Sequence, residues 1–189
     1  MKTIALFGGS FDPPHIGHEA IVKSLLDFKE IDEVVVMPTF LNPFKEISHA
    51  PSQIRFKWLE DIFSEFENVN VSGYEAGMRK KVPTIQTVKH LLKRYKKIYL
   101  VVGADNLPSI DRWEGFEELK ELVTIVVATR EDFVIDENFL KLDIDVNISS
   151  TQLRKNIDIS KLPKKCAKEI EKFYKEKNDR QNRKDNTHS

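Results

Sequence analysis

Short apolar, β-branched runs alternate with amphipathic helical patterns along most of the chain. The apolar runs are TIALF, EVVVMP, NVNVS, KIYLVVG, TIVVA and DVNI, and apolar residues recur at helical spacing near residues 21–26, 56–63, 85–92 and 113–122. Continuous apolar strands that alternate with such helices indicate parallel strands, right-handed crossovers and helices on both faces. We therefore predict an α/β fold with a doubly wound parallel sheet, in which a ligand binds beyond the carboxyl ends of the strands.

The length of 189 residues fits one compact domain with a full hydrophobic core. We expect this single domain over residues 1–177, closed by a C-terminal helix. The last segment, NDRQNRKDNTHS, has no apolar residue. The sequence therefore predicts a disordered polar tail over 178–189.

Composition excludes several classes of protein. Hydrophobic residues make up 40% of the chain and charged residues 32%, with no apolar run near the length that a membrane helix needs and no signal peptide. A formal net charge of zero argues against nucleic-acid binding, and the lysines after Lys161 are expected to form a solvated helix face. The single cysteine, Cys166, lies in a lysine-rich helical pattern and is expected to be an inert thiol. We predict a cytoplasmic protein without membrane contact, and the sequence carries no signal for an oligomeric state.

The loop GGSFDPPHIGH follows the first predicted strand and carries the clearest chemistry. Gly8 and Gly9 let the backbone approach a ligand closely, and the two prolines suit the start of a helix, whose free N–H groups attract phosphate. His15 and His18 are three residues apart, so both are expected to reach one phosphate from the first helical turn. Such a pair can also cap a helix or bind zinc, but the other histidines offer no third ligand. We predict no metal-ligating residues.

A second candidate segment, ISSTQLRKN, lies near the C-terminus. One of Ser149, Ser150 and Thr151 is expected to cap the helix that follows, and Arg154 falls on the same side of its first turn. The guanidinium group is a fork of donors suited to phosphate oxygens. Although this pattern alone is a common capping sequence, together with the first loop it predicts a polyphosphate site built from both ends of the chain.

The two motifs together resemble the signature of the nucleotidyltransferase superfamily, which implies a Rossmann-like nucleotidyltransferase fold. HIGH is also a signature of class I aminoacyl-tRNA synthetases, but the chain is too short for one and lacks a KMSKS-like motif. Phosphopantetheine adenylyltransferases usually carry Thr at the position of His15. The form with two glycines and two histidines is similar to bacterial nicotinate mononucleotide adenylyltransferases, over roughly residues 2–175.

This resemblance implies the remaining site residues. Lys45, in MPTFLNPFKE, would lie near the reacting phosphates, and Thr84 and Thr87, in VPTIQTVKHL, beside the acceptor. In VVGADNLPSIDRW, Asp105 would hold a ribose or a metal-linked group and Trp113 would stack on the pyridine ring, while Arg130 in VVATRED would meet the acceptor's phosphate. The implied catalytic residues are His15, His18, Lys45 and Arg154, and the implied ATP contacts are Gly8, Gly9, Ser10, Phe11, His15, His18, Gly103, Asp105, Ser149, Ser150, Thr151 and Arg154.

Two positions depart from the pattern of that family. Phe44 stands where many relatives have a histidine, and Pro83 precedes Thr84 where an aromatic residue is common. The resemblance implies adenylyl transfer from ATP, entering with Mg²⁺, to nicotinate mononucleotide, giving deamido-NAD and pyrophosphate in NAD biosynthesis. The alternatives are transfer to another acceptor, such as phosphopantetheine or a polyol phosphate, and a nucleotide-binding sensor without turnover.

Overall fold

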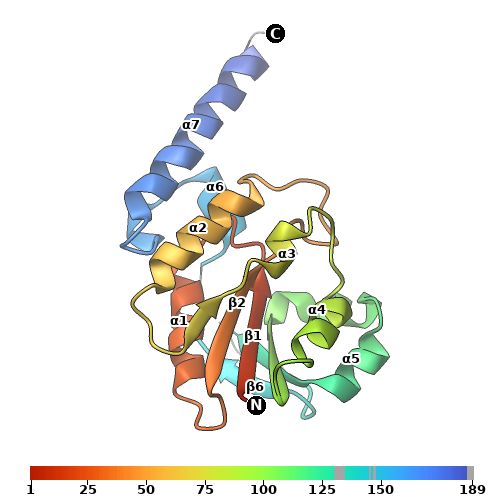
Figure 1. Ribbon diagram of the computed structural model, residues 1–189. Helices are drawn as coiled ribbons and strands as arrows, with labels where there is room; N and C mark the ends of the chain where they lie inside the picture. Colours follow the sequence, from red (N-terminus) through yellow and green to blue (C-terminus); the bar gives the residue numbers. More distant parts are fainter. Residues whose placement is uncertain (130–134, 145, 147, 187–189) are drawn as a thin grey trace.

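The fold is taken from a computed structural model, which describes residues 1–129, 135–144, 146 and 148–186. Six parallel strands form one sheet in the order β3-β2-β1-β4-β5-β6 (Figure 1). The strands are β1 (Thr3–Gly9), β2 (Glu33–Pro38), β3 (Val69–Val71), β4 (Lys97–Gly103), β5 (Thr124–Thr129) and β6 (Leu140–Asp143). The helices are α1 (Ile16–Leu26), α2 (Ser52–Phe63), α3 (Tyr74–Gly77), α4 (Thr84–Leu91), α5 (Phe116–Leu122), α6 (Ser150–Lys155) and α7 (Ala167–Asn186), with 3₁₀ helices η1 (Ala104–Arg112) and η2 (Ile159–Lys161).

Side chains from the two faces of the sheet enter two separate cores. Alternation along β1 sends Ala5 and Phe7 into a core shared with α1, α2 and α7, while Ile4 and Leu6 join α4 and α5 on the other face. Figure 1 shows these helices on opposite sides of the sheet. The doubly wound α/β fold predicted from the sequence is confirmed. Cys166 is buried in the first core, and burial raises the pKa of its thiol to about 11, as expected for an unreactive cysteine.

The strand order places a crevice beside β1. The chain moves outward from β1 to β2 and β3 and then returns to pair β4 with the other side of β1. At this reversal the loops after β1 and β4 diverge to opposite faces, and such a point is where open α/β sheets bind ligands. The loop GGSFDPPHIGH begins here.

The sixth strand lies earlier than the sequence predicts. We expect a strand at DVNI, but β6 is Leu140–Asp143, paired in parallel with β5, and residues 145 and 147 lie outside the described part. Only Leu142 of this edge strand is buried, while Lys141 and Asp143 pair with each other at 3.0 Å on the exposed side. An edge strand of this kind has a weaker apolar signal than the run that follows it.

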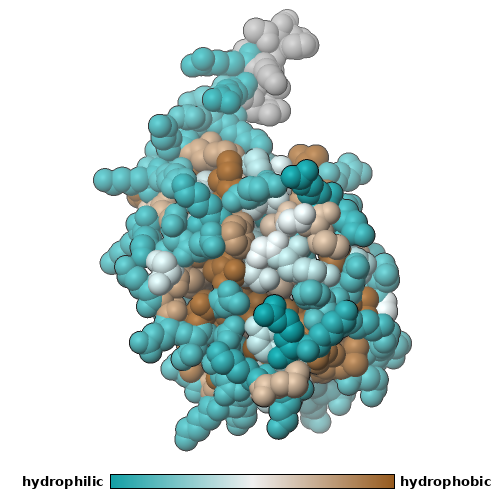
Figure 2. Space-filling model, in the orientation of Figure 1, coloured by the Kyte–Doolittle hydropathy of each residue, from teal (hydrophilic) through white to brown (hydrophobic). Residues whose placement is uncertain are grey.

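The C-terminal helix is longer than expected. Where the sequence predicts a polar tail from residue 178, α7 continues to Asn186 and projects from the rest of the molecule (Figure 1). This segment contains no glycine or proline, and ion pairs one turn apart, such as Glu176 with Lys172 and Arg180, support a solvated helix. The projecting part is covered by hydrophilic residues in Figure 2. In the described part of the chain, no helix has both the length and the apolar character needed to cross a membrane.

Candidate active site

A cavity of about 760 Å³ opens at the carboxyl ends of β1 and β4. Its wall comes from the loop after β1, the segment 39–45 after β2, the start of α4, the region of η1, and the start of α6. Fifteen of the residues singled out from the sequence line it: Gly8, Gly9, Ser10, Phe11, His18, Lys45, Thr84, Thr87, Gly103, Asp105, Trp113, Ser149, Ser150, Thr151 and Arg154. Of the remaining two, His15 does not line the cavity and Arg130 lies outside the described residues.

The loop after β1 is shaped around a buried phenylalanine. Phe11 has a left-handed backbone (φ 47°) and is 2% exposed. Its ring packs edge-on against Phe7 and His18, with centroids 5.3 and 4.8 Å apart. A Cβ on Gly9 would come within 3.3 Å of this ring, so the glycine lets the loop close over Phe11. The aromatic contact in turn supports the imidazole of His18 at the cavity wall.

The two histidines have different positions. His15 is the N-cap of α1, with extended backbone angles (φ −146°, ψ 168°), and is 1% exposed. Its ring stacks on that of His18 at 3.6 Å between centroids, and its backbone N–H donates to His18 Nδ1 at 3.1 Å. The ring of His15 therefore lies behind that of His18 in this structure, and contact of both imidazoles with one phosphate stays a prediction. A Cβ on Gly17 would lie 3.0 Å from His15 Nδ1, which explains the glycine between the histidines.

Arg154 and the start of α6 are attached to the first loop. Ser149 caps α6 by accepting a hydrogen bond from the backbone of Gln152 at 3.2 Å, as the sequence predicts. Ser150 Oγ donates to the Pro13 carbonyl at 2.8 Å, and the Arg154 guanidinium donates to the Asp12 carbonyl. Segments more than 130 residues apart in sequence therefore form one wall of the cavity.

Lys45 approaches the same wall from the segment after β2. The turn before it is closed by two bonds to Asn42, whose carbonyl accepts from Lys45 N–H and whose side chain accepts from Phe44 N–H, both at 2.9 Å. Phe44 is 58% exposed, so it does not draw this turn into the core. Partial burial, and then repulsion from Arg154, hold the pKa of Lys45 below its ordinary value. An anion bound between the two cations would relieve that repulsion.

Another part of the cavity wall combines η1 with the start of α4. A Cβ on Gly103 would overlap the Asp105 carboxylate, which also accepts a hydrogen bond from Asn106 at 3.3 Å. Trp113 is the C-cap of η1, so the helix predicted from this residue begins later, at Phe116. Pro83 is the N-cap of α4, and the proline fixes the entry of the chain into the helix without removing Thr84 from the cavity.

Sequence reasoning missed Arg55, a fully buried arginine on α2. Its Nε donates to the Ala50 carbonyl at 2.9 Å, and its Nη1 to the Ser10 carbonyl at 2.5 Å. Nη2 donates to the carbonyls of Thr39 and Phe40 at 2.7 and 3.0 Å. One guanidinium thus joins the loop after β1 to the segment that carries Lys45. The signal was a charge on the apolar stripe of a helix, since Arg55 shares the buried face of α2.

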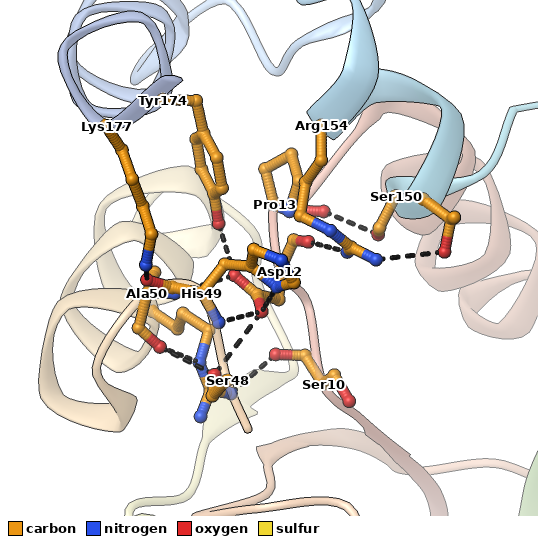
Figure 3. Close-up of polar contacts among 12 residues, drawn as sticks. Ser10, Asp12, Pro13, Ser48, His49, Ala50, Ser150, Arg154, Tyr174 and Lys177 are labelled. Carbon is orange, nitrogen blue, oxygen red and sulfur yellow. Dashed lines mark hydrogen bonds and ion pairs between the residues drawn. The ribbon is translucent and has the colours of Figure 1, made fainter. Parts of the chain in front are cut away.

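Asp12 is the second residue that was missed, and Figure 3 shows it among its polar contacts. Its side chain is buried, with 3% of the residue exposed. Its carboxylate accepts hydrogen bonds from the backbone N–H groups of His49 and Ala50, at 2.7 and 2.9 Å, and from the Tyr174 hydroxyl. Burial raises the pKa of Asp12, but the bonds from Tyr174, His49 and Ala50 outweigh burial and hold this pKa below its ordinary value. The carboxylate is therefore a fixed anion that joins three distant segments.

Glu75 is a third such residue, on the short helix α3. It is 6% exposed, lines the cavity, and accepts a hydrogen bond from Thr87 Oγ1 at 2.6 Å. Burial raises the pKa of Glu75 to about 7, although the bond from Thr87 opposes that shift. Thr87 itself is 1% exposed, so in this structure its hydroxyl stabilises the wall of the cavity through its bond to Glu75.

Replacing Glu75 by glutamine should stabilise the protein above neutral pH. Since its pKa rises from 4.5 to about 7 on folding, the folded state holds the proton more tightly, and stability falls as pH rises through this interval. At 1.36 kcal/mol per pH unit, Glu75→Gln should raise the free energy of unfolding by up to roughly 3 kcal/mol at about pH 8. Urea titrations at about pH 4.5 should give nearly equal values. An advantage of the variant that is the same at both pH values would contradict this prediction.

The acidic residues of the cavity decide whether it could hold a magnesium ion. Among the residues that the structure describes, no three His, Cys, Asp or Glu side chains gather as a metal site. Mg²⁺ in phosphate-binding sites is held by one or two carboxylates together with the substrate's phosphates. Asp105 places a carboxylate at the cavity wall, which is the type of ligand that such an ion takes.

Comparison with known sequences gives consistent matches. The profile of a family described as Cytidylyltransferase-like matches residues 6–156. A protein of Sulfurimonas denitrificans named "Probable nicotinate-nucleotide adenylyltransferase" is 64% identical over 93% of this chain and 97% of its own length. A protein of the same name from Campylobacter fetus is 44% identical over 94% of this chain and 99% of its own length.

Comparison with solved structures supports the fold. Nicotinic acid mononucleotide adenylyltransferase of Plasmodium falciparum, solved in complex with NaAD, superposes with a TM-score of 0.70 at 24% identity, covering 85% of this chain and 88% of that one. A structure from Vibrio parahaemolyticus described as a putative nicotinate-nucleotide adenylyltransferase gives a TM-score of 0.67 at 24% identity, covering 90% and 99%. At this identity the likeness concerns the fold.

Proposed function

The chain belongs to the cytidylyltransferase-like family, and from this premise we propose that it transfers the adenylyl group of ATP to nicotinate mononucleotide. The products are deamido-NAD and pyrophosphate, so the reaction is a step of NAD biosynthesis. Relatives with 64% and 44% identity, aligned over nearly their whole length, carry the name of this activity.

The observation that carries the proposal is the meeting of three cationic or polar side chains at one cavity. His18, Lys45 and Arg154 come from α1, from the segment after β2 and from α6, and all three line the crevice beside β1. A polyphosphate is the ligand that such a set of donors fits, and the glycines of the loop after β1 leave room for it.

In the proposed mechanism the protein supplies placement and charge. The nucleophile is a phosphate oxygen of the acceptor, already ionised at neutral pH, so the reaction needs no general base. In-line attack on the α-phosphorus of ATP builds negative charge on its oxygens and on the departing pyrophosphate. His18, Lys45 and Arg154 stabilise that charge. His15 holds the ring of His18 in place by stacking on it and by a hydrogen bond from its backbone N–H. Magnesium, entering with ATP as substrate, would offset phosphate charge, and Asp105 is the carboxylate that would hold it.

The acceptor occupies the other half of the cavity. Trp113 offers a flat ring on which a pyridine can stack, and Thr84 lies on the same part of the wall. We retain Arg130 as the candidate partner of the acceptor's phosphate. Nicotinate carries a carboxylate where nicotinamide carries a neutral amide, so this half of the site decides between the two acceptors.

The test is a pyrophosphate-release assay with the purified protein, ATP and Mg²⁺. Nicotinate mononucleotide, nicotinamide mononucleotide and phosphopantetheine are compared as acceptors, and the dinucleotide product is identified by mass. We expect turnover with nicotinate mononucleotide to exceed that with either other acceptor. Preferred turnover of phosphopantetheine would assign the alternative acceptor, and ATP binding without turnover of any acceptor would assign a sensor.

A further inference from the structure

One face of α7 carries three polar side chains that each contact a different segment of the site. Tyr174, Lys177 and Asn178 are spaced by three and four residues, which places them on the same side of the helix. The Tyr174 hydroxyl donates to the Asp12 carboxylate. Lys177 Nζ donates to the His49 carbonyl at 2.5 Å, and Asn178 Nδ2 to the Arg154 carbonyl at 3.1 Å. Figure 3 shows Tyr174 and Lys177 pointing from the helix into this network.

The three segments that α7 contacts are those that carry the phosphate-facing side chains. Asp12 belongs to the loop that leads into α1 and His18. His49 follows Lys45 in the same loop, and Arg154 lies on α6. The distances among these three groups therefore depend on elements that α7 holds together.

We propose that α7 is a positioning element of the active site, in which Tyr174 acts through Asp12 and Asn178 acts through the backbone of Arg154 to set the spacing of the phosphate-facing cations. The proposal rests on the proposed function. Tyr174 and Asn178 are positioning residues, since neither lines the cavity.

Burial and charge make Tyr174 suited to this role. It is 1% exposed, and its ring lies 6.1 Å from that of Trp58 in the core. Burial, and then the neighbouring charge of Asp12, raise the pKa of Tyr174, so its hydroxyl remains a donor throughout the working pH range. Asp12 in turn supplies the carbonyl that the Arg154 guanidinium binds. A displacement of Asp12 therefore displaces Arg154.

Apolar packing already attaches α7 to the body of the protein. Ile170 is fully buried, and Phe173 packs edge-on against Trp58 at 5.4 Å between centroids. The polar contacts of Tyr174 and Asn178 come in addition to this anchor. Loss of these polar contacts should therefore change the geometry of the site, while the apolar contacts keep the helix attached.

The experiment compares Tyr174→Phe and Asn178→Ala with the parent protein in the adenylyl-transfer assay, at a temperature where all are folded. Because misplacement by about 1 Å can cost about 100-fold in rate, we expect Tyr174→Phe to lower kcat/KM for ATP by at least about tenfold, and Asn178→Ala by about three- to tenfold. Lys175→Ala is the matched control on α7, because Lys175 is exposed and, among the described residues, pairs only with the partly buried Glu171 of the same helix. It should keep the parent's activity.

A double-mutant cycle separates positioning from general stability. If Tyr174 acts by placing Asp12 and Arg154, then in an Arg154→Ala background Tyr174→Phe should cost less than about threefold. An equal loss in both backgrounds, or parental activity of both Tyr174→Phe and Asn178→Ala, would overturn the proposal.

A further readout keeps the two proposals distinguishable. The parent's turnover alone decides the proposed function. If the parent binds ATP without turnover of any acceptor, the same cycle is measured as ATP affinity by calorimetry. Weaker binding by Tyr174→Phe that disappears in the Arg154→Ala background supports positioning, and unchanged or equally weakened binding overturns it.

Discussion

Replacing His18 by alanine should lower turnover by about 100- to 1,000-fold. This corresponds to about 2.7–4 kcal/mol of activation free energy, which is the typical effect of losing one well-placed donor to a developing negative charge. Of the paired histidines, His18 is the one whose ring lines the cavity, and its position is fixed by Phe11 on one side and His15 on the other. The loss should fall on kcat/KM for both substrates, because the charge is stabilised in the transition state that they share.

The matched control for this prediction is His90→Ala. His90 stacks on Tyr74 at 4.0 Å between centroids and does not line the cavity. The control should keep the parent's rate, and circular dichroism and thermal melts should show that both variants are folded. Turnover of His18→Ala within about threefold of the parent would remove His18 from the mechanism.

The largest loss of stability should come from Arg55→Ala. Its guanidinium donates to four backbone carbonyls in three segments, and the side chain is fully buried. Each buried acceptor left without a donor costs about 1–3 kcal/mol, and the truncation also leaves a void. We therefore expect the free energy of unfolding to fall by at least about 3 kcal/mol, measured by urea titration.

Two further variants identify the cause of this loss. Arg55→Met restores most of the volume but no donor, so it should recover only a minor part of the stability. Lys57→Ala removes an exposed charge from the same helix and should change the free energy of unfolding by less than about 0.5 kcal/mol. If Arg55→Met were as stable as the parent, packing rather than hydrogen bonding would explain the buried arginine.

The sheet could be predicted well because its strands are buried on both faces. The run KIYLVVG coincides with β4 and EVVVMP with β2, since helices on both sides of a parallel strand require an uninterrupted apolar sequence. The prediction failed at the edge, where β6 buries only Leu142 and its sequence resembles a loop. The last turns of α7 were missed because ion pairs between successive turns support this solvated helix, so its sequence needs no apolar stripe.

The glycines and capping residues of the cavity wall could be predicted because they act on the backbone next to them in the sequence, and the places of Lys45 and Arg154 were implied by the family resemblance. Gly9 and Ser149 follow from local geometry alone. By contrast, Arg55 and Asp12 act between segments about 40 residues apart, and no local pattern encodes such a contact. The stacking of His15 behind His18 could not be predicted, because spacing gives the side of a helix but not the rotamer of a cap residue.

The contact between the Arg154 guanidinium and the Asp12 carbonyl joins residues that are 142 positions apart. At synthesis rates of about 5–20 residues per second, roughly 7 to 28 s separate the addition of these two residues on the ribosome. Throughout that interval the glycine loop exists without its guanidinium partner. In a nascent chain this wall of the cavity therefore stays incomplete until α6 and its Arg154 have been synthesised.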